Sequence, residues 1–262
     1  MTELLIDALS VTLGRRRIFD KLTLRPVRPG CMLAVLGPNG VGKSTLLRAI
    51  ARLVSARGNV SLGRIDLLHG SHGDHVKHVG YLPQTLPQAS TLLVYEAVSG
   101  ALRATCGRLS NVEHDARVQA VFAQLHLDGL AMKPLDRLSG GQRQMVGLAQ
   151  VLVRQTPLLL LDEPTSALDL RWQLLALEAM RNAAKRKSAI VVIAMHDLNL
   201  ASRFCDRVLL LGPQGVLADG PPSDALEPDQ LRRAYSVDAR LERTARGECL
   251  VVVERAVVRA DD

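Results

Sequence analysis

The most constraining feature of this sequence is a complete phosphate-binding pattern. It follows the apolar run Met32–Leu36 and occupies Gly37, Pro38, Asn39, Gly40, Val41, Gly42, Lys43, Ser44 and Thr45. Glycines at this spacing allow a tight turn whose N–H groups point at phosphate oxygens, and the loop opens into a helix whose positive end faces the same anion. The segment therefore predicts a nucleoside triphosphate site, with Lys43 on the β- and γ-phosphates and Ser44 on Mg²⁺.

Two acidic residues follow a second apolar run. Leu158–Leu161 has the pattern of a buried strand, and Asp162 and Glu163 come directly after it. Ligands of parallel α/β sheets lie at the carboxyl ends of the strands, so we expect these carboxylates beside the phosphates. Asp162 suits a water-mediated Mg²⁺ contact, and Glu163 suits a general base that polarises the attacking water. A strand followed by an acidic helix cap would explain Asp162 alone.

Strand and helix patterns alternate along the chain, which predicts an α/β fold with a mostly parallel sheet covered on both faces. The candidate strands are Leu4–Leu13, Ile18–Leu24, Met32–Leu36, Val79–Leu82, Leu158–Leu161, Ile190–Ala194, Val208–Leu211, Val216–Ala218, Val237–Glu242 and Cys249–Glu254. A central stretch predicts helices alone, over Val94–Arg103, Val112–His126 and Gly140–Arg154. We therefore expect a nucleotide-binding core at 1–85 and 157–220, an inserted α-helical subdomain at 86–156, and a short extension at 221–262.

Composition narrows the class of protein further. The net charge of +7 is spread along the chain, and only three Phe, three Tyr and one Trp are present. A nucleic-acid surface would need aromatic residues among the basic ones, so nucleic acid is not an expected partner. The longest apolar run, Ala189–Met195, is far shorter than a membrane span. The four isolated cysteines fit reduced thiols better than a zinc site or a disulfide framework.

A third motif makes the family recognisable. Leu138 is followed by Ser139, Gly140, Gly141 and Gln142, and the S-x-x-Q spacing is that of a capping box at a helix start. Together with the phosphate loop and the acid pair, this segment resembles the ATPase subunit of an ABC transporter, over residues 1 to about 220. The resemblance implies a RecA-like P-loop NTPase core with an antiparallel β edge. It also implies that Ser139–Gln142 bind the ATP of a second, identical subunit.

The same resemblance assigns further residues one at a time. Gln84 matches the glutamine loop that touches Mg²⁺ and the attacking water. Asp169 matches the loop that crosses the dimer seam, and the role of a helix N-cap is equally open to it. His196 matches the histidine that contacts the γ-phosphate. Leu13 stands where the family commonly has an aromatic residue against adenine, so we expect apolar contact without full stacking unless one of Arg15–Arg17 covers the ring.

Four histidines recur at a spacing of three residues: His69, His72, His75 and His78. This spacing is not a known tetrahedral ligand pattern, and Gly70 and Gly73 favour a polar surface loop over a metal site.

The remaining expectations concern partners. A single nucleotide-binding unit implies a homodimer with two sites related by a two-fold axis. The segments 166–173 and 195–201 and the end of the chain resemble ATPases of bacterial importers for iron–siderophores, haem and cobalamin. This implies a peripheral protein on the cytoplasmic side of the inner membrane, integral-membrane permease subunits as partners and, indirectly, a binding protein.

Two alternatives stay open: an importer ATPase for another cargo, and an ABC ATPase without a membrane partner. Leu92, Leu93 and Tyr95 are expected to serve the permease contact, or else to pack the helical subdomain.

Overall fold

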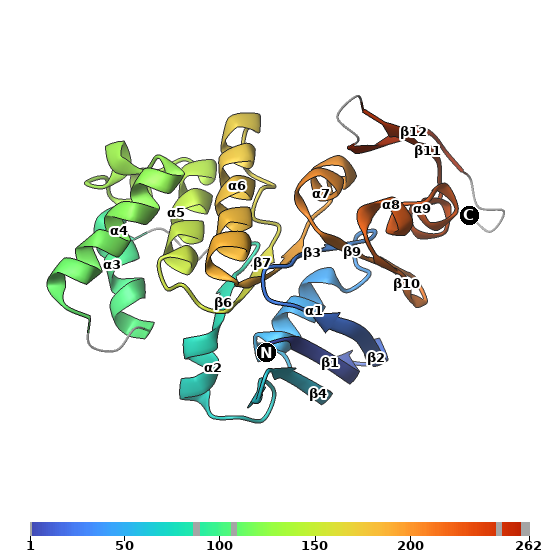
Figure 1. Ribbon diagram of the computed structural model, residues 1–262, viewed down its shortest axis with the longest axis horizontal. Helices are drawn as coiled ribbons and strands as arrows, with labels where there is room; N and C mark the ends of the chain where they lie inside the picture. The colour runs from blue at the N-terminus through green and yellow to red at the C-terminus, as the bar shows by residue number, and fades with distance from the viewer. Residues whose placement is uncertain (1, 86–89, 106–108, 245–247, 258–262) are drawn as a thin grey trace.

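A six-stranded sheet forms the centre of the molecule (Figure 1). The structure, a computed structural model, describes residues 2–85, 90–105, 109–244 and 248–257. The strand order is β10–β9–β3–β8–β7–β6, and every neighbouring pair is parallel except β10 with β9. The bounds are β3 (Met32–Leu36), β6 (Val79–Leu82), β7 (Leu158–Asp162), β8 (Ile190–Ala194), β9 (Arg207–Gly212) and β10 (Gly215–Gly220). The mostly parallel α/β fold with an antiparallel edge is thus confirmed.

A second sheet of four antiparallel strands has the order β2–β1–β4–β5. Its strands are β1 (Leu4–Leu13), β2 (Arg16–Val27), β4 (Ala56–Leu62) and β5 (Ile65–Asp66). The sequence did not predict β4 or β5, nor that the first two strands belong to a sheet of their own.

The side chains of β3 alternate between two cores. Leu33 and Val35 pack with α1 (Lys43–Ile50) and the inner faces of β1, β2 and β4. Met32, Ala34 and Leu36 face the other core, which is built mainly from helices. Successive strand residues point to opposite faces, so a strand covered on both faces must be apolar throughout. This requirement explains the uninterrupted apolar runs that precede the phosphate loop and the acid pair.

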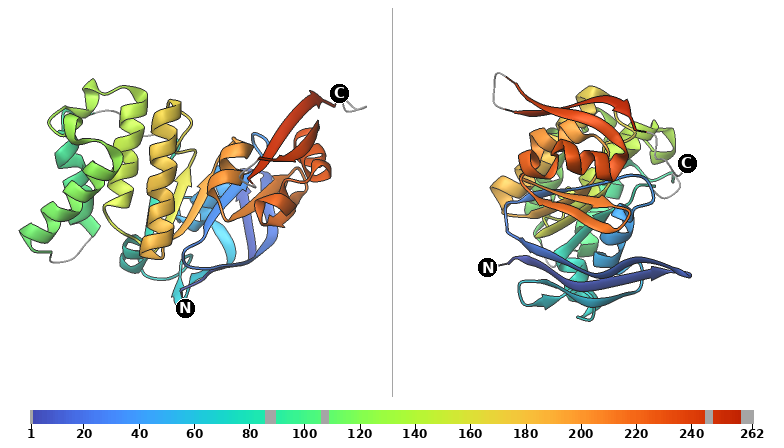
Figure 2. Two further views of the ribbon diagram at one scale, coloured as in Figure 1. Left: turned by 45° about the horizontal axis from the view of Figure 1, so that its top comes forward. Right: turned by 90° about the vertical axis from the view of Figure 1, so that its right-hand side faces the viewer.

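Three helices gather at one end of the molecule (Figure 1 and the left view of Figure 2): α3 (Val94–Thr105), α4 (Asn111–Leu125) and α5 (Gly140–Leu152). Their bounds lie within two residues of the predicted ones. The other helices are α2 (His72–His78), α6 (Leu170–Lys187), α7 (Leu198–Phe204), α8 (Pro222–Ala225) and α9 (Pro228–Tyr235), with 3₁₀ turns at Asp128–Leu130 and Leu135–Arg137. Among the described residues, no helix has the length and apolar character needed to span a membrane.

His72, His75 and His78 lie in the helix α2, so the predicted surface loop is wrong for these three and holds only for His69, in the exposed turn before the helix. Ser71 caps α2 by accepting a hydrogen bond from Asp74 N at 3.0 Å. His75 is buried, and its Nε2 lies 3.1 Å from the carbonyl oxygen of Ile50. Tertiary packing of one histidine and a good cap therefore outweigh the low helix propensity of the segment.

The chain ends in an antiparallel hairpin of β11 (Val237–Arg243) and β12 (Cys249–Ala256). Figure 2 shows this hairpin lying along the helices α7 and α9. Both strands were predicted, with bounds shorter by one or two residues.

Candidate active site

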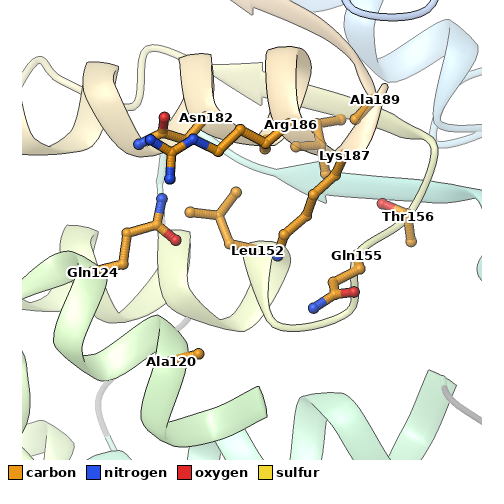
Figure 3. A pocket seen from close by; sticks show the side chains of 11 residues that line it. Ala120, Gln124, Leu152, Gln155, Thr156, Asn182, Arg186, Lys187 and Ala189 are labelled. Carbon is orange, nitrogen blue, oxygen red and sulfur yellow. The ribbon is translucent and has the colours of Figure 1, made fainter. Parts of the chain in front are cut away.

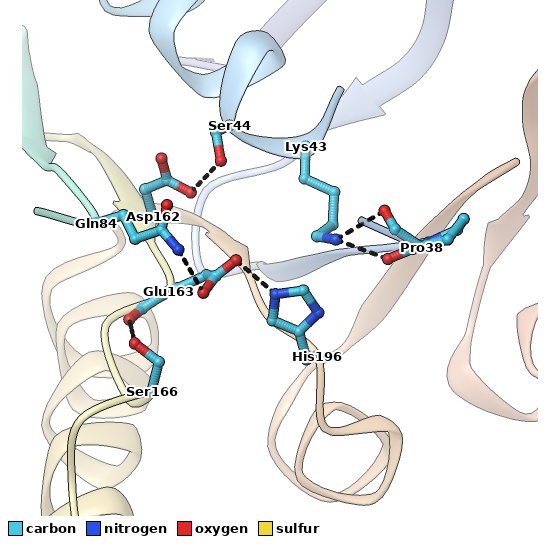
Figure 4. A network of polar contacts seen from close by, with 9 residues as sticks. Pro38, Lys43, Ser44, Gln84, Asp162, Glu163, Ser166 and His196 are labelled. Carbon is cyan, nitrogen blue, oxygen red and sulfur yellow. Dashed lines mark hydrogen bonds and ion pairs between the residues drawn. The ribbon is translucent and has the colours of Figure 1, made fainter. Parts of the chain in front are cut away.

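The phosphate loop has the backbone that its glycines predict. Gly37, Gly40 and Gly42 all have positive φ, at 143°, 75° and 115°. The Lys43 ammonium folds back and donates hydrogen bonds to the carbonyl oxygens of Gly37 at 2.7 Å and Pro38 at 3.1 Å (Figure 4). Burial lowers the pKa of Lys43, while the nearby carboxylates of Glu163 and Asp162 raise it. Within the described residues Lys43 forms no salt bridge, and backbone oxygens of the loop hold its ammonium in place.

Asp162 and Ser44 form a direct pair between two elements. Asp162 is the last residue of β7, and Ser44 lies in the first turn of α1. The Ser44 hydroxyl donates a hydrogen bond to Asp162 Oδ1 at 2.8 Å. Asp162 is only 2% exposed. Its burial raises the pKa of the carboxyl group, and the Ser44 hydrogen bond partly opposes that shift.

Glu163 is held by two partners that come from different strand ends. Gln84 follows β6 and donates from Nε2 to Glu163 Oε2 at 2.9 Å. His196 follows β8, and its Nε2 lies 2.5 Å from Glu163 Oε1. Glu163 itself has a positive φ of 50°, and its backbone N–H donates to Ala194 O at 3.0 Å. The carboxylate is therefore aimed by its backbone and by both neighbours toward the phosphate loop (Figure 4).

One open cavity of about 400 Å³ joins these groups. Its lining is Asn39, Gly40, Gly42, Lys43, Ser44, Thr45, Gln84, Glu163 and His196. The strand ends of a parallel sheet meet at this edge, as the sequence predicted. The volume lies in the range of ordinary small-molecule sites.

The segment Ser139–Gln142, called the signature segment below, lies at the start of α5 and not in this cavity. Ser139 caps α5, and the capping box is complete: the Ser139 side chain accepts from Gln142 N at 3.2 Å, and Gln142 Oε1 accepts from Ser139 N at 3.1 Å. None of Ser139, Gly140, Gly141 and Gln142 lines the phosphate-loop cavity. Asp169 is an N-cap, since it accepts from Trp172 N at 2.9 Å and begins α6. It too lies outside the lining of that cavity.

A smaller hollow opens beside the phosphate loop. Arg16, Arg17, Ile18 and Phe19 line it together with Gly40 and Val41. Leu13, at the end of β1, is not in that lining. Sequence reasoning missed Phe19, which packs against Gly42 so closely that a Cβ on the glycine would lie 2.8 Å from the ring. An apolar and an aromatic residue at the start of β2, directly after Arg15–Arg17, could have predicted that Phe19 lies beside the phosphate loop.

The described residues hold no group of three or more His, Cys, Asp or Glu side chains arranged to bind a metal ion. The described cysteines, Cys31, Cys205 and Cys249, are free thiols, and Cys106 lies outside the described residues.

Known proteins resemble this chain over nearly its whole length. Residues 21–166 match the ABC transporter family. The hemin import ATP-binding protein of Streptomyces coelicolor is 39% identical, over 94% of this chain and 87% of the relative. The iron(3+)-hydroxamate import ATP-binding protein of Bacillus subtilis is 34% identical, over 95% of each chain.

Two solved structures share the fold. One is a metal-chelate type ABC transporter in an inward-facing conformation, with a TM-score of 0.81 and 25% identity over 97% of this chain and 98% of that chain. The other is a dimeric bacterial ABC transporter cassette, with a TM-score of 0.74 and 25% identity over 84% of this chain and 98% of that chain. The family match spans the phosphate loop, the signature segment and both acids. The chain therefore belongs to the ABC transporter family and to its ATP-binding proteins.

Proposed function

We propose that this chain hydrolyses ATP at the cavity between its phosphate loop and Glu163, and that it drives import of a metal chelate as the ATPase of an importer. The observation that carries the hydrolytic part is the Glu163 carboxylate. It is fixed between Gln84 and His196 in the same cavity as Lys43 and Ser44.

The oxygen groups beside the loop fit a magnesium ion. The Ser44 hydroxyl and the Asp162 carboxylate are paired, and Gln84, which uses its amide nitrogen on Glu163, has an amide oxygen to offer. Magnesium prefers such oxygen ligands and keeps several waters. Burial disfavours the ionised form of Asp162, and a nearby magnesium cation would favour that form again. Bound Mg²⁺ would neutralise charge that develops on the β- and γ-phosphate oxygens.

Glu163 is the proposed general base. Both of its carboxylate oxygens are in use, one with His196 and the other with Gln84. We expect an ATP γ-phosphate to take over the His196 contact, because an anionic oxygen competes for the same imidazole nitrogen. Glu163 Oε1 is then free to accept a proton from a water molecule. As that water's oxygen bonds to the γ-phosphorus, the bond to the ADP oxygen breaks, and Lys43 stabilises the negative charge.

Two copies of the chain are proposed to form the complete sites. The phosphate-loop cavity lacks Ser139–Gln142, although the capped start of α5 presents N–H groups and a positive helix end suited to a phosphate. A second copy related by a two-fold axis would supply that helix start to each ATP, with Asp169 at the seam. The similarity to a dimeric cassette supports this arrangement.

The importer part of the proposal rests on the relatives. They are named for hemin and for iron(3+)-hydroxamate at comparable identity, and the sequence resemblance also includes cobalamin importers, so the cargo is proposed as a class: an iron–siderophore, haem or cobalamin. In this proposal, residues 1–85 and 157–220 form the core, 86–156 the helical subdomain that meets the permease, and 221–262 an extension. The protein would sit peripherally on the cytoplasmic face of the cell membrane, with a binding protein as an indirect partner.

The test of the base is Glu163→Gln. The variant should bind ATP normally, accumulate a closed dimer, and turn over about 10²- to 10⁴-fold more slowly, the usual contribution of a general base. The matched control is Glu178→Gln, at an exposed glutamate of α6 outside the cavity, which should keep wild-type turnover. Turnover of Glu163→Gln within a few-fold of wild type would remove Glu163 from this role.

The test of the shared site uses two inactive variants. Ser139→Arg blocks the helix start, and Lys43→Ala empties the phosphate loop of its cation. Mixing Ser139→Arg with an excess of Lys43→Ala should restore one competent site per heterodimer. If both variants fold and dimerise but no ratio restores activity, each chain hydrolyses ATP alone.

A further inference from the structure

A second cavity, of about 410 Å³, lies beside the C-terminal half of α6 (Figure 3). Its walls come from α4, from the turn between α5 and β7, and from the last turns of α6. The polar lining residues are Gln124, Gln155, Thr156, Asn182, Arg186 and Lys187. No acidic residue is among them.

Two cations reach into this space without a carboxylate partner. Arg186 and Lys187 form no ion pair with any residue of the described part of the chain. Partial burial lowers the pKa of Lys187, and the positive charge of Arg117 on α4 lowers it further. Arg186 and Lys187 are neighbours in the lining, and an anion between these two like charges would offset their mutual repulsion.

The surrounding amides are of the right type to complete an anion site. In Figure 3 the Gln124 side chain from α4 points toward Arg186 from α6, and Lys187 extends toward Leu152 and Gln155. Gln124 Nε2 makes one long hydrogen bond, to Ala179 O at 3.4 Å, which leaves its second N–H available. Leu152, Leu159 and Ala183 supply an apolar wall. Such a mixture of convergent polar groups on an apolar wall is typical of small-molecule sites.

Basic residues near the end of a helix also complement its dipole, and this offers a simpler explanation for Lys185, Arg186 and Lys187. The helix dipole explains why these residues are basic, but it does not explain where their side chains point. Lys185 turns away and pairs with Asp206 at 2.6 Å. Arg186 and Lys187 turn into the cavity instead (Figure 3).

We propose that this cavity binds a small phosphate monoester. The phosphate lies between the Arg186 guanidinium and the Lys187 ammonium, amide groups of Gln124 and Asn182 donate to its remaining oxygens, and the organic body packs against Leu152 and Leu159. A guanidinium and an ammonium together suit a phosphate dianion, since Arg can bind two oxygens at once and Lys acts as a point charge. This site is separate from the phosphate loop and does not depend on the proposed hydrolytic mechanism.

The experiment is a titration of the full chain with phenyl phosphate, observed through ¹⁵N side-chain amide signals. Saturating ADP and Mg²⁺ fill the phosphate loop first, so that the probe reports on the second cavity. The variants are Arg186→Gln and Lys187→Gln, and the matched control is Lys185→Gln in the same helical turn. Phenol serves as the uncharged probe.

We expect phenyl phosphate to shift the amide signals of Gln124 and Asn182 saturably, while phenol does not. Arg186→Gln and Lys187→Gln should each weaken binding by about tenfold or more, as loss of a charge-assisted contact implies, and Lys185→Gln should bind within about twofold of wild type. Equal weakening in all three variants would show only a general surface charge effect and overturn the proposal. Absence of saturable shifts in the folded wild-type chain would overturn it as well.

Discussion

Replacing Gly37 with alanine should damage the protein far more than the same change at Gly40, although both glycines have positive φ. A Cβ on Gly37 would lie 2.5 Å from the carbonyl oxygen of Leu211 and 3.0 Å from a methyl group of Val41. A Cβ on Gly40 would meet nothing within 4 Å. The pair thus separates the cost of an unfavourable backbone angle from the cost of a collision with the neighbouring strand.

The magnitudes follow from this geometry. Gly40→Ala, at φ of 75°, should cost only the strain of a left-handed residue, about 1–2 kcal/mol. Gly37→Ala carries strain of about 1–3 kcal/mol and must also displace the end of β9, which pairs with β3 through Leu36 and Leu210. Losing one or two strand hydrogen bonds adds about 1 kcal/mol each, which gives about 2–5 kcal/mol in all.

Guanidinium unfolding of both variants measures these costs as shifts in midpoint at an unchanged slope, which separates stability from a change in the denatured state. Nucleotide affinity measured on the same samples should fall more for Gly37→Ala, because its carbonyl oxygen also holds the Lys43 ammonium. Equal losses of unfolding free energy in the two variants would refute the role of the contact with β9.

Three further predictions concern His75 in α2, Leu92 just before α3, and Tyr95 in α3. Burial and neighbouring positive charges lower the pKa of His75, so the folded state favours its neutral form; the stability that this provides should be lost as pH falls below the unfolded-state value of about 6.5. Urea midpoints between pH of about 7.5 and 5.5 should therefore fall less in His75→Gln than in wild type, whereas His72→Gln, on the exposed side of α2, should follow wild type. Leu92, at 52% exposed, should tolerate Ser with unchanged unfolding free energy and basal turnover but lose co-purification with membrane subunits, and stable protein with unchanged co-purification would contradict the permease contact. Tyr95→Ser should lower stability by about 2–4 kcal/mol, since its ring packs edge-on against Phe122 at 6.2 Å.

The elements that sequence predicted well are those whose signal is local. The capping box at Ser139 needs only two residues three apart, and the structure contains both of its hydrogen bonds. The strands before the phosphate loop and before Asp162 are apolar throughout because both of their faces are covered. In each case a short run of residues contains the whole physical reason, so no tertiary information was needed.

The missed elements depend on contacts distant in sequence. The strand β4 has only two fully buried apolar side chains, Val60 and Leu62, and its backbone is held by pairing with β1. Gly58, within β4, allows the close approach to β1, since a Cβ there would lie 2.4 Å from Ala8 O. Likewise, Leu92 and Tyr95 look equivalent in sequence, but only Tyr95 finds partners inside the helices, with its hydroxyl donating to Asp115 at 3.0 Å.

The position of His196 depends on the C-terminal hairpin, whose strands the sequence predicted but whose contact with α7 it did not. On one side, Met195 N donates to Val35 O at 3.3 Å and ties the end of β8 to β3. On the other side, Asp197 caps α7, where Asn199 pairs with both backbone groups of Val251: it accepts from N at 2.7 Å and donates to O at 3.2 Å. The Asn199 amide thus bonds the N–H and the C=O of Val251, as a neighbouring strand would do. This pair of hydrogen bonds joins α7 to β12. Because His196 lies between these two attachments, its distance to Glu163 is set by the central sheet and by the C-terminal hairpin together.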